Sequence, residues 1–193
     1  MRSPEHHGSA RLYEVNGTTR YTIESQRRPK SVSIERRGLG RAVIRDQLPM
    51  DDKGLMRCLQ DGLAPADWYL LLNGKVFFWL TRPRLLRLLK AGTYRREEHD
   101  VLEIQTAALI AAYSEKIWFC PMNSGCKPFP HPRGTSSFQR ITDYPYSVWK
   151  QKRPRGERVV ELAIDYAVPD VRQFVKRVVR MRGEKQIAIL YEP

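Results

Sequence analysis

The sequence has no long apolar run. Its longest uninterrupted one is the six residues from Ala107 to Ala112, far short of the roughly 20 residues that a membrane-spanning helix requires. The first twenty residues are polar and mixed in charge, unlike a secretory signal peptide. We therefore expect no membrane segment and no secretory signal.

Cysteine is scarce. The three residues Cys58, Cys120 and Cys126 are an odd number without a dense framework, which favours a reducing, cytoplasmic setting over a disulfide-bonded one. Cys120, Cys126 and His131 are spaced C-x5-C-x4-H, which is wider than usual zinc motifs and one ligand short unless His99 or Cys58 joins. Buried thiols are the better interpretation, and we expect no metal site.

The signatures of several enzyme classes are also missing. The sequence contains no GxxxxGKS/T phosphate loop, no GxGxxG after a strand, no GxSxG elbow and no HExxH. Each of these motifs supplies a specific phosphate cradle, nucleophile or metal ligand set. P-loop kinases, Rossmann dehydrogenases, GxSxG hydrolases and zincins are therefore excluded.

Positive charge is abundant. The 34 Lys and Arg residues against 21 Asp and Glu residues give a net charge of +13 and a pI of about 10.0. A basic run contains Arg153, Arg155 and Arg158, which we take as candidate contacts for DNA or RNA. A solvated basic surface explains the same run equally well.

The composition is that of a folded protein. Hydrophobic residues make up 41% and charged residues 28% of the 193 residues, so neither a disordered nor a fibrous chain fits. The length predicts a single domain. Within it, residues 1–48 form a basic N-terminal region with little readable pattern, and residues 49–193 form the core.

Turn residues and apolar spacing predict the elements of that core. Helices are expected from Asp51 or Asp52 to Gly62, with Leu55, Met56 and Leu59 on one face, from Pro65 to Leu72, from a Thr81 cap to Gly92, and from Ala107 to Tyr113. Strands are expected at Ser31–Glu35, Lys75–Leu80, Val101–Ile104, Lys116–Cys120 and Val159–Ile164, with a terminal hairpin of Val175–Arg182 and Lys185–Leu190. Residues 121–137 contain four prolines and predict a long loop of the kind that often carries function or docks a partner.

Glu161 is the most unusual residue of these elements. It is a charged residue in an otherwise apolar strand, and alternation places it with Val159 and Ala163, opposite the more apolar face. One interpretation is an exposed strand face or a carboxylate paired with Arg158. The other is a catalytic carboxylate, which requires partner residues.

A family resemblance supplies such partners. Three segments are similar to DarT-type ADP-ribosyltransferases, and residues 24–180 resemble more closely an uncharacterised bacterial family related to DarT. The segments similar to DarT are Val159–Asp170, Val76–Arg82 and Trp118–Gly125. The closer resemblance rests on Ser25–Ile34, Gly40–Gln47, Leu72–Trp79, Asn123–Gly125 and Asp143–Pro145.

The resemblance implies an α+β fold of the ADP-ribosyltransferase type, with two small, mostly antiparallel sheets around an NAD cleft and helices on the flanks. It implies that NAD is a substrate and that Glu161 is the catalytic carboxylate. Arg82 would grip NAD, Phe78 and Trp79 would wall the nicotinamide, and Asn123 would contact the substrate from its turn. The implied activity is a toxin-like mono-ADP-ribosyltransferase with nucleic acid as its acceptor.

The sequence departs from the DarT pattern at its start. The family opens with a strand whose His and Thr hold NAD, followed by a helix closing in Gly, and the sequence has no such opening unless His6-His7-Gly8 is the end of that helix. The alternative is therefore a catalytically inactive module of the same fold that binds nucleic acid or a partner protein, for example an antitoxin.

Overall fold

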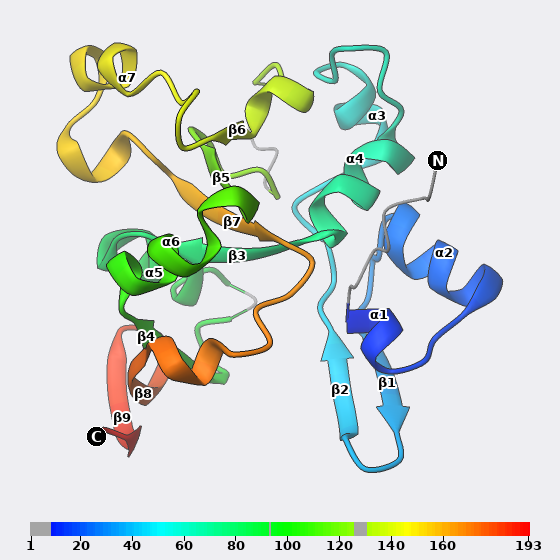
Figure 1. The fold of residues 1–193 in the computed structure, drawn as a ribbon. Helices are drawn as coiled ribbons and strands as arrows, with labels where there is room; N and C mark the ends of the chain where they lie inside the picture. The colour runs from blue at the N-terminus through cyan, green and yellow to red at the C-terminus, as the bar shows by residue number, and fades with distance from the viewer. Residues whose placement is uncertain (1–8, 93, 126–130) are drawn as a thin grey trace.

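The computed structural model describes residues 9–92, 94–125 and 131–193, with the side chains of residues 9 and 11 excepted. Within these residues, three antiparallel sheets and short helices make an α+β fold (Figure 1). The sheets have two, four and three strands, in the orders β1-β2, β3-β7-β5-β6 and β4-β8-β9. The expected α+β class with small antiparallel sheets is confirmed, although the described residues form three sheets where two were expected.

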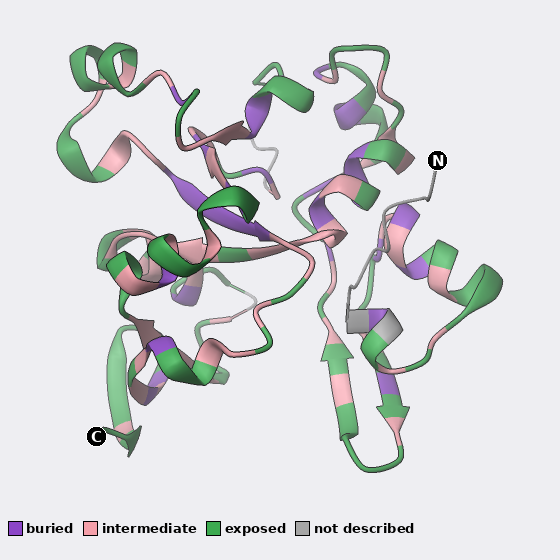
Figure 2. Cartoon of the chain, in the orientation of Figure 1, coloured by how far each residue is buried: buried purple, intermediate pink, exposed green. Residues whose placement is uncertain are grey.

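The four-stranded sheet is built around β7. This strand pairs with β3 on one side and with β5 on the other, and its first four residues are buried (Figure 2). A strand with apolar cover on both faces has to be almost entirely buried. The strands are β3 (Lys75–Trp79), β5 (Ile117–Cys120), β6 (Gln139–Arg140) and β7 (Glu161–Asp165).

The two faces of this sheet have separate cores. Ala163 packs with Trp68 of α4 (Pro65–Asn73) and with α3 (Asp52–Met56). Leu162 packs on the opposite face with Leu109 of α6 (Thr106–Tyr113). Pro65 starts α4 at a position where a missing N–H costs nothing. The expected helices at Pro65 and Ala107 are therefore confirmed to within a residue.

The three-stranded sheet carries its own small core. Leu89, Val179 and Met181 are buried together there. The terminal hairpin is confirmed, with its turn at Gly183, where a φ of +55° suits glycine. The elements are α5 (Arg82–Leu89), β4 (Glu98–Ile104), β8 (Val175–Arg182) and β9 (Lys185–Tyr191).

The N-terminal region is more ordered than its sequence indicates. The helix α2 is anchored on α4, where the Asn73 side chain donates to the Glu24 carbonyl at 2.7 Å. Arg28 is buried and donates at 3.1 Å to the Asn73 side chain. The elements are α1 (Ser9–Leu12), α2 (Gly17–Ser25), β1 (Val32–Arg36) and β2 (Gly40–Ile44), the last two forming a hairpin that projects from the molecule (Figure 1).

Several local expectations were wrong. Met56 is 69% exposed and does not share the buried face of Leu55, because successive residues of a helix point about 100° apart. The Thr81 side chain makes no cap hydrogen bond to α5. The predicted loop contains η2 (Thr135–Ser137), while residues 126–130 of that loop lie outside the described residues. The strands β2 and β6 were not anticipated, nor were η1 (Ser114–Lys116), α7 (Tyr146–Lys152), η3 (Arg155–Glu157) and η4 (Val171–Phe174).

No helix formed by the described residues has the length and apolar character needed to cross a membrane.

Candidate active site around Glu161

Glu161 begins β7 and is only 4% exposed. In register it lies directly between Trp79 of β3 and Cys120 of β5, so the three side chains share one face of the sheet. The interpretation as an exposed strand face was therefore wrong. The pairing with Arg158 is not found either, because that guanidinium donates to the Arg153 carbonyl and to the Tyr146 hydroxyl.

The partner of Glu161 is the turn that follows β5. The backbone N–H of Ser124 donates to both carboxylate oxygens, at 3.2 Å each. Ser124 is itself buried. A buried carboxylate needs such donors, because burial without hydrogen bonds is costly.

Two arginines hold this turn in place. Arg153 donates to the Pro121 carbonyl at 2.5 Å, at the start of the turn. Arg133 donates to the Ser124 carbonyl at 3.2 Å, near its end. The amide that faces Glu161 is thus fixed from both sides.

The electrostatic setting raises the pKa of Glu161 from its ordinary 4.5 to about 7. Burial is the main cause, and it outweighs the hydrogen bonds from Ser124 and the positive charges of Arg84 and Arg133, which lower the pKa. Burial, with the nearby Glu161 charge, also raises the pKa of the Cys120 thiol. A carboxyl group that titrates near neutrality can both accept and donate a proton under physiological conditions.

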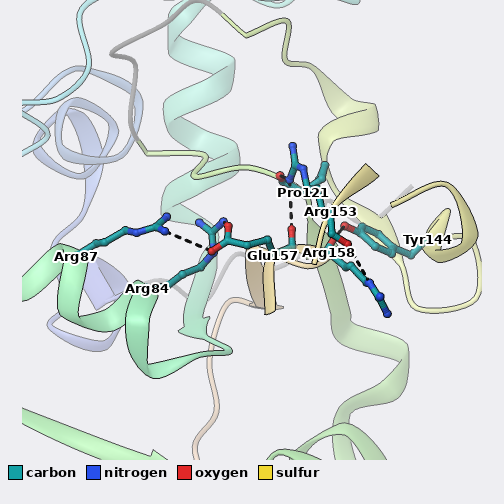
Figure 3. A network of polar contacts seen from close by, with 7 residues as sticks. All are labelled: Arg84, Arg87, Pro121, Tyr144, Arg153, Glu157 and Arg158. Carbon is teal, nitrogen blue, oxygen red and sulfur yellow. Dashed lines mark hydrogen bonds and ion pairs between the residues drawn. The ribbon is translucent and has the colours of Figure 1, made fainter. Parts of the chain in front are cut away.

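Besides Arg133, the cations near this site come from α5 and from the segment before β7 (Figure 3). Arg84 forms an ion pair with Glu157, and Arg87 lies 3.5 Å from the same carboxylate. Burial and neighbouring arginines lower the pKa of Arg84. The rim of the Glu161 site is therefore positively charged, although Glu157 partly offsets it.

A large cleft lies on the other side of the four-stranded sheet. Its volume is about 1380 Å³, and it is lined by β3, α5, β4 and the segment after β7. Phe78 and Leu162 are opposite one another in register and both line it. Leu162 follows Glu161 directly, and successive strand residues point to opposite faces. The cleft and the Glu161 carboxylate are thus separated by the sheet.

The predicted NAD-binding residues are divided between these two places. Phe78 and Arg82 line the cleft, where the Arg82 side chain is 55% exposed and lies 3.9 Å from Glu103. Trp79 is opposite Glu161 and also borders the cleft. Asn123 is exposed in the turn beside Ser124. Only Trp79 and Asn123 are therefore brought near Glu161.

Three residues of the Glu161 site were missed from the sequence: Arg84, Ser124 and Arg133. The Ser-Gly pair at 124–125, directly after a strand, is a turn signal that could have indicated Ser124. Arg84 is one of several arginines in the segment 82–87, and nothing in the local sequence distinguishes it or Arg133.

The basic run is partly used for internal contacts. Arg153 and Arg158 hold backbone carbonyls and are half-buried, whereas Arg155 is exposed. The guanidinium of Arg153 lies 4.3 Å from the centre of a Trp149 ring, and that of Arg158 lies 5.6 Å from the Tyr146 ring. This surface interleaves cations and aromatic rings.

Among the described residues, no group of three or more His, Cys, Asp or Glu side chains could hold a metal ion. Cys58 and Cys120 are buried free thiols, as expected. Cys126 lies outside the described residues, so the C-x5-C-x4-H spacing stays a sequence observation.

Fold and site together define a small, basic α+β protein. At the start of its central strand it has a buried carboxyl group whose pKa is raised to about 7. Residues 7–175 match the sequence model of a family of unknown function, DUF7002. Because the match covers most of the chain, the chain belongs to this family. No curated protein and no solved structure matches it.

Proposed function

We propose that the protein is an NAD-dependent mono-ADP-ribosyltransferase related to the DarT type, with Glu161 as the catalytic carboxylate. The observation that carries the proposal is the buried Glu161 carboxyl, held by the Ser124 amide, whose pKa is raised to about 7. The resemblance of Val159–Asp170 to the DarT segment with the catalytic glutamate supports the same residue.

The chemistry requires a carboxylate of this kind. The bond between nicotinamide and ribose breaks with its electron pair leaving on nicotinamide, and positive charge develops on the ribose. An ionised Glu161 stabilises that charge. The acceptor then forms the new bond to the ribose carbon, and its proton passes to Glu161 as general base. With water as acceptor, the products are ADP-ribose and nicotinamide.

The face of the sheet that carries Glu161 is where we place the nicotinamide ribose. Trp79, directly opposite in register, offers an aromatic wall on that face. Arg84 supplies a nearby positive charge, while Arg82 is left to the cleft on the other face. Either arginine could hold the NAD phosphates, because the guanidinium fork suits phosphate geometry. Substitution of each arginine in turn distinguishes them.

Nucleic acid is the acceptor class that the surface favours. In the segment 146–158, Arg153 lies beside the Trp149 ring and Arg158 beside the Tyr146 ring, and Arg155 is exposed. Cationic grooves with aromatic side chains are typical of single-stranded nucleic-acid binding. The segment lies next to the catalytic turn, because Arg153 donates to the Pro121 carbonyl. The same surface favours the second candidate function, a non-catalytic nucleic-acid-binding module.

The test is nicotinamide release from NAD by the purified chain, with and without single-stranded DNA or RNA. Glu161→Gln is expected to reduce release about 100-fold or more, since it removes both charge and base. Glu115→Gln is the matched control, because Glu115 is exposed and distant in sequence. Release that Glu161→Gln leaves unchanged would refute the mechanism.

The second measurement separates the arginines and the two functions. Arg84→Gln and Arg82→Gln are compared for their effect on the KM for NAD, and the larger increase identifies the arginine that holds the phosphates. Absence of nicotinamide release, together with nucleic-acid binding that weakens steeply with salt, would instead support the binding module.

A further inference from the structure

Arg133 is the second-largest fully buried side chain among the described residues, with 1% of its surface exposed. Arginine is rarely buried to this extent, because its charge must be transferred out of water. A position that tolerates this cost usually gains specific contacts from it. The contacts of Arg133 lead to Glu161.

The backbone of Arg133 is fixed to the segment that follows α3. Its N–H donates to the Cys58 carbonyl and its carbonyl accepts from the Gln60 N–H, each at 2.9 Å. Residues 59 and 133 thereby form a short parallel bridge. The side chain thus starts from a fixed point.

The guanidinium reaches from there to the catalytic turn. It donates to the Ser124 carbonyl at 3.2 Å and to the His131 carbonyl at 3.3 Å, and it lies 5.9 Å from the Trp68 ring. The N–H of the same Ser124 donates to Glu161. Two successive hydrogen bonds therefore connect the guanidinium to the carboxylate.

We infer that Arg133 is a positioning residue that holds the Ser124 amide against the Glu161 carboxylate and thereby favours its ionised form. The inference rests on the proposed function, because it assigns a role relative to the catalytic carboxylate. A positive charge nearby and donors to the ionised form both favour ionisation.

Other charged or titratable groups near Glu161 also affect its ionisation or the turn that faces it. Arg84 of α5 lowers the pKa of Glu161 by its charge, and the Ser124 hydrogen bonds lower it further. Cys120 of β5 lies directly opposite. Arg153, which precedes η3, holds the other end of the turn. Loss of Arg133 alone therefore shifts ionisation of Glu161 without abolishing it.

The experiment follows the Glu161 carboxyl directly by carbon NMR on protein labelled at glutamate side chains. The Glu161 signal is assigned as the one that Glu161→Gln removes. In Arg133→Gln we expect the titration midpoint to rise by about one pH unit, which lowers the ionised fraction at pH 7 about fivefold. Arg172→Gln, at an exposed arginine, is expected to leave the midpoint unchanged.

Arg133→Lys guards against loss of folding in the first variant. Lysine keeps the charge but has no planar fork, so we expect a folded protein with a smaller upward shift of the midpoint. Nicotinamide release is followed in parallel, and its pH dependence should move with the midpoint while the KM for NAD stays constant.

Each outcome is decisive. A Glu161 midpoint equal to wild type in folded Arg133→Gln, or in Arg133→Lys if only that variant folds, would overturn the inference. If that happens while release still depends on Glu161, the proposed function stands without it. A shifted midpoint without any NAD turnover supports the role of Arg133 and rejects the proposed function.

Discussion

Stability should depend on pH through Glu161. Burial raises the pKa of Glu161 from 4.5 to about 7, so the folded chain holds this proton more tightly than the unfolded chain does. The stabilisation from protonated Glu161 is therefore complete below about pH 4.5 and is lost as the pH rises through about 7. The difference corresponds to about 3 kcal/mol, an order-of-magnitude figure for a side chain that is almost fully buried.

The perturbation that isolates this contribution is Glu161→Gln, which cannot ionise. As the pH rises from about 4 to about 8.5, the wild type should lose about 3 kcal/mol in its free energy of unfolding relative to the variant. The assay is urea unfolding at a series of pH values, with Glu115→Gln as control. Parallel curves for wild type and Glu161→Gln across this range would refute the reasoning, since Glu161 would then ionise alike in both states.

Three further predictions concern what holds the fold. Asp51→Ala removes the acceptor of the Gly54 N–H at 2.7 Å and should cost about 1 kcal/mol in urea unfolding, whereas Asp51→Asn should cost little. Lys75→Met breaks the 2.7 Å ion pair with Asp165 and should cost about 3 kcal/mol, with coupling in a double-mutant cycle; additive losses would argue against the pair. Trp68→Ala empties a site with 0% exposure and should cost about 3 to 5 kcal/mol by thermal or urea unfolding, so a loss below about 1 kcal/mol would contradict the packing described.

Elements with a periodic buried face were predictable from the sequence. The alternation of residues 159–164 placed Glu161 and Leu162 on opposite faces, and the paired strands confirm it. The Pro65 start of α4 and the Gly183 turn were likewise predicted, because their signals act within a few residues. Local chemistry decides such features before any tertiary contact forms.

Elements without a buried stripe were not predictable. The helix α7 contains no buried residue, so it has no core-facing stripe of the kind that marks a helix in a sequence. The N-terminal helix α2 depends on contacts from Asn73 and Arg28 to its last turn. Tertiary packing contributes most of the stability of such short helices.

The burial of Glu161 could not be predicted for a related reason. Its donor, Ser124, is 37 residues away, and the arginine behind that turn is fixed by a bridge between residues 59 and 133. Alternation distinguishes the two faces of a strand, but it does not determine which face another segment covers. An acidic residue on such a face is ordinarily exposed, and here a distant turn covers it.

The segment from Trp79 to Arg84 is the place where the cleft and the Glu161 site meet. Trp79 ends β3 opposite Glu161 and borders the cleft. In the first turn of α5, Arg82 lines the cleft while Arg84 acts on the charge of Glu161. Residues two apart on a helix do not face the same way, so one short turn sends one cation to each side of the sheet. Comparison of Arg82→Gln with Arg84→Gln separates the two sides: only Arg84→Gln should move the Glu161 titration midpoint, and an equal movement in both would place the two arginines in a single site.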